Sequence, residues 1–167
     1  MIKIPSHEVH NVELIKAAAS VFDTLMISTG AAIWTEVERI MGLLDIDRTI
    51  LMHCVSAYPC PPGKVNLKRM EALRMLGGVV GYSGHYVGIE DAIAAICSGA
   101  MFVEKHFTID QSLPGRDNRF AVLPDEIKRL ALFRDVHLEM MEDHGLDLQD
   151  CEADIFNNYR GRWSGDA

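Results

Sequence analysis

The chain has 167 residues and a formal net charge of −8, a length that suits one domain with a hydrophobic core. Its charges are scattered, which excludes polynucleotide binding through a basic surface, and no apolar run approaches the ~20 residues of a membrane helix. The first residues lack the basic and apolar segments of a secretory signal, and the four cysteines form no C-x-x-C spacing. We therefore expect a cytoplasmic protein with reduced thiols, and neither nucleic acid nor membrane among its partners.

Five short apolar runs are the predicted strands, and none of them alternates with polar residues. That texture is typical of parallel strands that are covered on both faces. The runs start roughly 22 to 29 residues apart, which leaves room for one helix and two loops between successive strands. In chain order they are Ile2–Pro5, Thr24–Ser28, Thr49–Cys54, Gly78–Tyr82 and Ala100–Glu104.

Helical patterns occupy the intervals between these strands. The first three helices are expected to begin at capping side chains: Asn11, the pair Thr35 and Glu38 in a capping box, and Asn66. The fourth carries an apolar stripe that stops at Gly99. The last begins at Pro124, a favoured first-turn residue, and runs to about Glu142.

Repeated strand–helix alternation predicts an α/β architecture with a parallel sheet. Two closures are open at this point: a doubly wound open sheet, or part of a (β/α)₈ barrel. A complete barrel needs ~250 residues, so this chain has room for about five of the eight units. Length alone favours the open sheet.

Polar and ionisable residues follow the strands at the point where each one ends. In both architectures such residues converge on one mouth, where the chemistry of the fold collects. In chain order they are Ser6, His7 and Glu8; Ser28, Thr29 and Gly30; His53, Ser56 and Tyr58; Ser83, Gly84 and His85; and Glu104, Lys105 and His106, before a loop with Asp117.

Two subsets of these residues indicate specific chemistry. His85 and His106 have the ligand type for a shared divalent metal, although a core histidine with a hydrogen-bond partner is the commoner role. A lysine with several hydroxyls suits a phosphate, although serines after strands also serve routinely as helix caps. The candidates for this second subset are Lys3, Ser6, Ser28 and Ser83.

Six motifs occur in a fixed order along the chain. They are K-I-P-S-x-E from Lys3, S-T-G from Ser28, H-C-x-S-x-Y-P from His53, G-x-S-x-H-x-x-G from Gly81, E-K-H-F-T from Glu104 and P-G-x-D from Pro114. In order and spacing they resemble the sialic acid (N-acetylneuraminate) synthase family, from Lys3 to near Glu142. The resemblance implies a partial (β/α)₈ TIM barrel, about strands 4 to 8, over residues 1–145. Residues 146–167 would then form a C-terminal tail of unknown role.

The resemblance also implies a set of site residues. His85 and His106 would hold a divalent metal, typically Mn²⁺, and Glu8 would lie near the reacting carbons as an acid–base or positioning group. Tyr58 and Asp117 would contact the amino sugar. Phosphoenolpyruvate would bind to Lys3, Ser6, Ser28, Ser83 and Ser56, the last of which stands where the family often has asparagine.

The implied reaction condenses phosphoenolpyruvate with an N-acylated amino-sugar aldehyde of the N-acetylmannosamine type. The methylene carbon attacks the polarised aldehyde, water adds to the resulting cationic carbon, and phosphate leaves. The product is a nine-carbon 2-keto-3-deoxy acid. Related synthases that make legionaminic or pseudaminic acid remain open alternatives.

The chain departs from the family pattern in three respects. The first three strands are absent, Gly84 replaces the aspartate of the family's common S-D-H, and the tail does not resemble the family's antifreeze-like domain. Because a partial barrel leaves two sheet edges open, we expect a homo-oligomer or a complementing polypeptide. The alternative is a non-catalytic half-barrel that serves as an interaction or structural protein.

Overall fold

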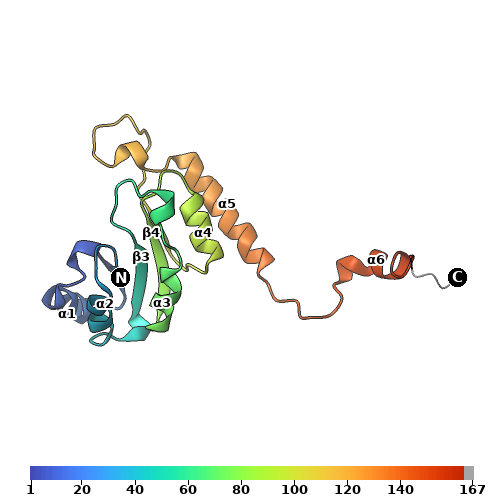
Figure 1. Ribbon diagram of the computed structural model, residues 1–167, viewed down its shortest axis with the longest axis horizontal. Coiled ribbons are helices and arrows are strands. Elements are labelled where there is room, and N and C mark those ends of the chain that lie inside the picture. Colours follow the sequence, from blue (N-terminus) through green and yellow to red (C-terminus); the bar gives the residue numbers. More distant parts are fainter. Residues whose placement is uncertain (164–167) are drawn as a thin grey trace.

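Five parallel strands form one sheet in the computed structural model, which describes residues 1–163 (Figure 1). Residues 164–167, the end of the expected tail, lie outside the described residues. The strands follow one another in the sheet in chain order, and each is separated from the next by helical structure. They are β1 (Ile2–Ile4), β2 (Leu25–Ser28), β3 (Thr49–Cys54), β4 (Val79–Gly84) and β5 (Val103–Lys105).

All five predicted strands are therefore confirmed, with shifts at their ends. The fourth extends two residues further than expected, to Gly84, and the fifth begins only at Val103. Between the preceding helix and β5, Met101 N already donates to Val80 O, and Phe102 O accepts from Tyr82 N. Residues 101 and 102 thus already bond to β4, although the strand itself begins only at Val103.

The sheet is strongly curved, because side chains from its two outermost strands meet. Lys3 of β1 forms an ion pair with Glu104 of β5 across the concave face. Neighbouring strands lie about 4.8 Å apart, so a flat five-stranded sheet would separate these strands by about 19 Å, beyond the reach of the two side chains. The chain is thus part of a (β/α)₈ barrel wall, as the motif resemblance implied, and not an open doubly wound sheet.

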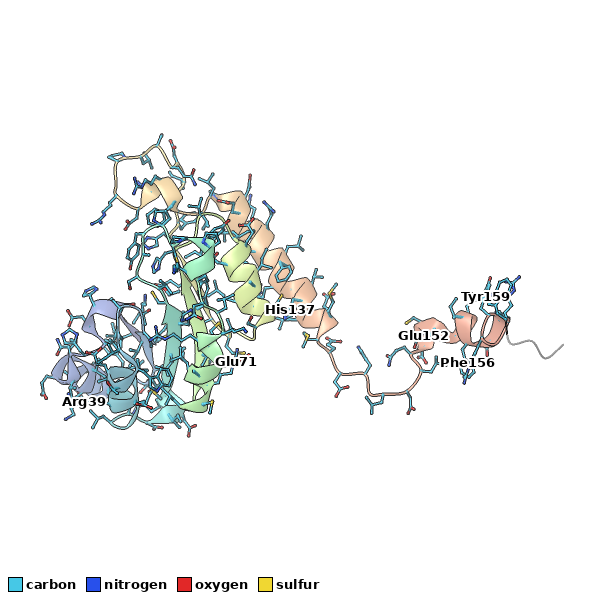
Figure 2. The ribbon with its side chains drawn as sticks, viewed as in Figure 1. Arg39, Glu71, His137, Glu152, Phe156 and Tyr159 are labelled. Carbon is cyan, nitrogen blue, oxygen red and sulfur yellow. The ribbon has the colours of Figure 1, made fainter. Side chains whose placement is uncertain are left out.

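Four helices cover the convex face of this wall. They are α1 (Val12–Val21), α2 (Trp34–Met41), α3 (Arg69–Met75) and α4 (Glu90–Cys97). Their inward residues, among them Ile15, Ile40 and Leu73, pack against strand residues such as Ile27 and Leu51, all essentially inaccessible to solvent. Figure 2 shows Arg39 of α2 and Glu71 of α3 on the opposite, solvent-facing surface.

The predicted helix starts have mixed outcomes. Asn11 caps α1 as expected, with its Oδ1 accepting from Leu14 N at 3.1 Å. The capping box of Thr35 and Glu38 is wrong: α2 begins at Trp34, and Glu36 accepts from Ile33 N instead.

The remaining helix boundaries divide in the same way. Asn66 does not open α3, because it has a φ of 51° and the helix begins three residues later, at Arg69. Gly99 follows the end of α4 with a φ of +81°, and Pro124 is the first residue of α5 (Pro124–Met140), both as expected.

The C-terminal part projects from the barrel wall. Helix α5 packs on α4 through a small apolar cluster that includes Leu130, Val122 and Ile89. An extended segment then leads to α6 (Ala153–Asn158), which lies away from the sheet, with Phe156 and Tyr159 exposed (Figures 1 and 2). The four cysteines are free, and no helix within residues 1–163 is both long and apolar enough to cross a membrane.

Candidate functional site

A cavity of about 410 Å³ opens at the carboxyl ends of the strands, on the concave face of the sheet. Seven of the sequence-predicted site residues line it: Lys3, Ser6, Ser56, Tyr58, Ser83, His85 and His106. Cys54 and Glu104 also line it; the sequence had placed Glu104 at the mouth without giving it a role, and it had not assigned Cys54 to the site. The strand-end pattern thus predicted the location of this cavity and most of its polar lining.

Strand alternation decides which side chains enter the cavity. Ser83 of β4 and Glu104 of β5 are register partners and face the concave side, where Ser83 Oγ donates to Glu104 Oε2 at 2.8 Å. Cys54 faces the cavity, whereas the preceding His53 faces the helices, with Nε2 2.8 Å from Val65 O. His53 is therefore a core histidine and not a cavity residue.

Glu104 is the central carboxylate of the concave face. Its Oε2 accepts hydrogen bonds from both Lys3 Nζ and Ser83 Oγ. Burial would raise the pKa of this carboxyl, but the hydrogen bonds from Lys3 and Ser83 and the Lys3 charge hold the pKa below its usual value. Glu104 is therefore ionised at neutral pH, and Lys3 has a counter-ion when no anionic ligand is bound.

His85 is held in one tautomer. Its Nδ1 lies 3.0 Å from the carbonyl oxygen of Val55, which can only accept, so Nδ1 carries the proton and Nε2 keeps its lone pair. Burial lowers the pKa of His85, against the opposing effect of the Val55 hydrogen bond. The ring is therefore neutral at pH 7, the form that binds metals.

His106 lies beside His85 at the next strand end. The two ring centroids are 5.2 Å apart, and the Tyr58 ring lies 4.3 Å from that of His85. Nδ1 of His106 is 3.7 Å from Asp117 Oδ2, which is too long for a hydrogen bond. Asp117 itself sits on the loop above the site and is not among the cavity residues.

The two histidines fit a divalent cation as a pair of ligands. Within residues 1–163, no group of three or more His, Cys, Asp or Glu side chains is arranged to hold a metal ion. Because a divalent cation takes about four to six ligands, the remaining ones would come from water, substrate or another polypeptide. The neutral imidazole of His85, whose Nδ1 is engaged by Val55 O so that the lone pair is on Nε2, is the feature that supports this fit.

The serines occupy three different environments. Ser6 Oγ accepts from Gly30 N at 3.1 Å, so it tethers two strand-end loops rather than capping a helix. A Cβ at Gly30 would overlap Ser56 Oγ and lie 2.9 Å from Ser6 Oγ, so the glycine gives both hydroxyls their room. Ser28 is buried with an unpartnered Oγ and is not among the residues that line the cavity.

Glu8 does not reach the cavity in this structure. Its Oε2 accepts from Asn11 Nδ2 at 2.8 Å, which directs the carboxylate toward the start of α1. The carboxylate that lines the cavity is Glu104. The sequence contained this residue in the E-K-H-F-T motif, but its direction could be read only from its register with Ser83.

Comparisons with known proteins place the chain in a sequence family. The sequence model of the NeuB family matches residues 1–143. The chain is 37% identical over 136 residues to the N,N'-diacetyllegionaminic acid synthase of Campylobacter jejuni, covering 78% of this chain and 41% of that protein. It is 40% identical over 134 residues to the N-acetylneuraminate-9-phosphate synthase of Drosophila melanogaster, covering 77% and 36% respectively.

A solved structure extends the likeness beyond the family match. The crystal structure of N-acetylneuraminic acid (sialic acid) synthetase from Leptospira borgpetersenii in complex with citrate is similar, with a TM-score of 0.83 and 31% identity. That similarity covers 98% of this chain and 58% of the solved one. The chain spans only 36% to 41% of the length of the two curated relatives above.

Proposed function

Because this chain belongs to the NeuB family, we propose that it carries part of the active site of a synthase that condenses phosphoenolpyruvate with an N-acylated amino-sugar aldehyde. The barrel portion would comprise residues 1–145, with residues 146–167 as an appended tail. One observation supports this most strongly: a lysine, three serine hydroxyls and two histidines, contributed by β1, β3, β4, β5 and the loops that follow them, line a single cavity. This is the combination that an anionic phosphate ester and a polarised carbonyl require together.

Phosphoenolpyruvate would bind on the Lys3 side of the cavity. Lys3 supplies a cation, and the hydroxyls of Ser6, Ser56 and Ser83 supply neutral donors on the same face. Lys3 is paired with Glu104, so an incoming phosphate would exchange one anionic partner for another. We keep Ser28 in the phosphate set, although it does not line the cavity, because its buried hydroxyl has no hydrogen-bond partner within residues 1–163.

The amino sugar would bind on the opposite side, near the histidines. His85 and His106 would hold a divalent cation, with Mn²⁺ as the leading candidate. When bound, such a cation supplies a positive charge that polarises the aldehyde oxygen. Tyr58 offers a ring surface against His85, and Asp117 offers a carboxylate on the loop above for the hydroxyls or amide of the sugar.

The condensation balances with water and phosphate. The methylene carbon of phosphoenolpyruvate forms a bond with the aldehyde carbon, whose oxygen gains a proton and becomes a hydroxyl. Water adds to the cationic carbon left behind, and loss of inorganic phosphate gives the 2-keto group of a nine-carbon acid. We assign the acid–base or orienting role near these carbons to Glu104 in addition to Glu8, because Glu104 lines the cavity and is ionised.

Activity would require further barrel strands beside the five that the structure describes. Within residues 1–163, β1 pairs only with β2 and β5 only with β4, so both sheet edges offer unpaired backbone groups. A cation held by His85 and His106 also needs further ligands. We propose that a homo-oligomer or a separate polypeptide supplies these strands.

A non-catalytic half-barrel is the second candidate function. It is favoured by the lack of a metal cluster of three or more ligands among the described residues. The two functions differ in what they require of His85 and His106, since an interaction protein has no need of a cation at that place.

Co-expression with a complementing polypeptide tests the proposal. The chain would be purified with the first three strand–helix units of a NeuB relative and assayed for phosphate release with phosphoenolpyruvate, N-acetylmannosamine and Mn²⁺. We expect turnover that His85→Ala and His106→Ala abolish and that His137→Ala, a histidine stacked on Phe133 of α5, leaves intact. A stable complex without turnover and without bound Mn²⁺ would reject the enzyme and leave the interaction protein.

A further inference from the structure

A second charge pair lies directly behind the cavity, on the convex face of the sheet. Lys105 Nζ is 2.9 Å from both oxygens of Asp91 on α4, and the two side chains are only 3% and 1% exposed. Tyr82 donates its hydroxyl to Asp91 Oδ2 at 2.8 Å, and Lys105 also donates to the carbonyl oxygen of Tyr86. Both members of this buried pair therefore have the additional hydrogen bonds that a buried ion pair needs.

The pair fits only because position 84 has no side chain. Gly84 is the register partner of Lys105, and a Cβ there would overlap Asp91 Oδ2 and lie 2.6 Å from Tyr82 Cε1. The carboxylate of Asp91 thus occupies the space into which a side chain at position 84 would extend. Where the resemblance leads one to expect an aspartate on β4, a carboxylate from α4 occupies the space beside Gly84.

Lys105 also borders the cavity and lies between Glu104 and His106. In a strand, neighbouring side chains point to opposite faces, so anchoring the Lys105 side chain on the convex face directs Glu104 to the concave face. His106 follows directly after the last residue of β5, so the same anchor fixes the backbone from which its side chain enters the cavity. Strand β5 has only three residues and one partner strand within the described chain, so its ladder alone offers little to fix this direction. The buried contacts of Lys105 supply that constraint.

We propose that Asp91 is a positioning residue that anchors Lys105 under Gly84 and thereby holds Glu104 and His106 in the cavity. The inference rests on the proposed function only for the identity of the groups that it positions. The positions of Glu104 and His106 can be measured on the chain by itself, without an activity assay.

The test moves the carboxylate from one element to the other. Asp91→Ala removes it, Gly84→Asp adds a second one to a filled space, and the double variant Gly84→Asp with Asp91→Ala returns a single carboxylate from β4. Asp125→Asn, which removes the exposed partner of Lys128 on α5, is the matched control. The imidazole NMR resonances of His106 and His85 and the affinity for Mn²⁺ alone would be measured on each folded chain.

We expect Asp91→Ala to shift the His106 resonances and weaken Mn²⁺ binding by about tenfold, as loss of an outer-shell contact does. The double variant should restore both, and the control should change neither. Unchanged His106 resonances in Asp91→Ala would overturn the inference. So would a double variant that recovers thermal stability without recovering the resonances, because the pair would then be only a stabilising contact.

The proposed function and the positioning role of Asp91 fail in different ways. If the unaltered chain binds no Mn²⁺, the proposed cation site at His85 and His106 is wrong, while the His106 resonances still show whether Asp91 positions that ring. If Asp91→Ala does not fold, the double variant carries the decision. A double variant that folds with native His106 resonances supports the positioning role, and one that also fails to fold contradicts it.

Discussion

The two faces of the sheet at β5 use the same kind of ion pair for different ends. Glu104 and Lys105 are consecutive residues, yet Glu104 pairs with Lys3 inside the cavity and Lys105 pairs with Asp91 beneath the helices. The concave pair is accessible, with side chains 33% and 43% exposed, and each member also belongs to the cavity lining. The side chains of the convex pair are only 3% and 1% exposed. Adjacent positions of β5 thus contribute to one accessible ion pair and to one buried ion pair.

The largest expected effect would come from breaking the buried pair. Asp91→Ala leaves the Lys105 ammonium buried with only the Tyr86 carbonyl as partner. Removal of one member of a buried ion pair typically lowers the free energy of unfolding by about 3–5 kcal/mol. Urea unfolding followed by circular dichroism would measure this loss. A change below about 1 kcal/mol would mean that water reaches Lys105, and the contrast between the faces would fail.

An intermediate effect is expected from crowding the concave face. Gly30→Ala places a methyl group against the Ser6 and Ser56 hydroxyls and against Cys54 Sγ. Overpacking of this kind costs about 1–3 kcal/mol. The same variant should weaken binding of inorganic phosphate, measured by calorimetry, because two of the proposed donors are displaced. Gly42→Ala is the control, since a Cβ there meets its neighbours only at ordinary contact distances.

A smaller effect is expected from removing the accessible pair. Glu104→Gln should lower the free energy of unfolding at pH 7 by less than about 1 kcal/mol, because solvent screens a half-exposed pair. The pKa of Glu104 is depressed in the fold, so its contribution is complete above the unfolded pKa of about 4.3 and is lost as pH falls through the folded value. Acid titration of stability should therefore be steeper below about pH 4.3 for the wild type than for the variant.

The smallest expected effect concerns the charge state of His85. Burial lowers its pKa, so NMR titration should give a midpoint below the ordinary value of 6.5. The unfolded chain then binds the proton more readily than the fold, so stability falls as pH drops below about 6.5. A midpoint above 6.5 would show that a carboxylate, and not burial, governs this ring.

The sequence predicted the strands of the barrel wall better than the boundaries of its helices. Buried parallel strands have a simple signature, and the runs at Thr24 and Thr49 needed no tertiary information to be recognised. The start of α2 was missed because Glu36, and not Glu38, accepts from the backbone N–H of Ile33, while Glu38 accepts from the Trp34 side chain. Which glutamate caps the helix therefore depends on the local backbone geometry, and the spacing of residues in the sequence does not determine it.

The site shows the same division. The strand-end rule placed His85 and His106 in one cavity, whereas Glu104 required the β4–β5 register to be assigned. Asp91 had no signal at all, because it lies in the first turn of an amphipathic helix where an acidic residue is ordinary. Its partner lies fourteen residues away on another element, and only the packing of α4 on the sheet brings them together.

The lengths of the strands taper from the middle of the sheet to its margins. The strands β3 and β4 have six residues each, β2 has four, and the outermost, β1 and β5, have three. Short margins offer few free amide and carbonyl groups, and such brevity is one way in which proteins avoid stacking into fibrils. Additional chains therefore gain little from ladder bonds at these margins. A chain that binds beside β1 or β5 must therefore be recognised mainly by side chains around these strands. This requirement favours a specific partner over non-specific polymerisation.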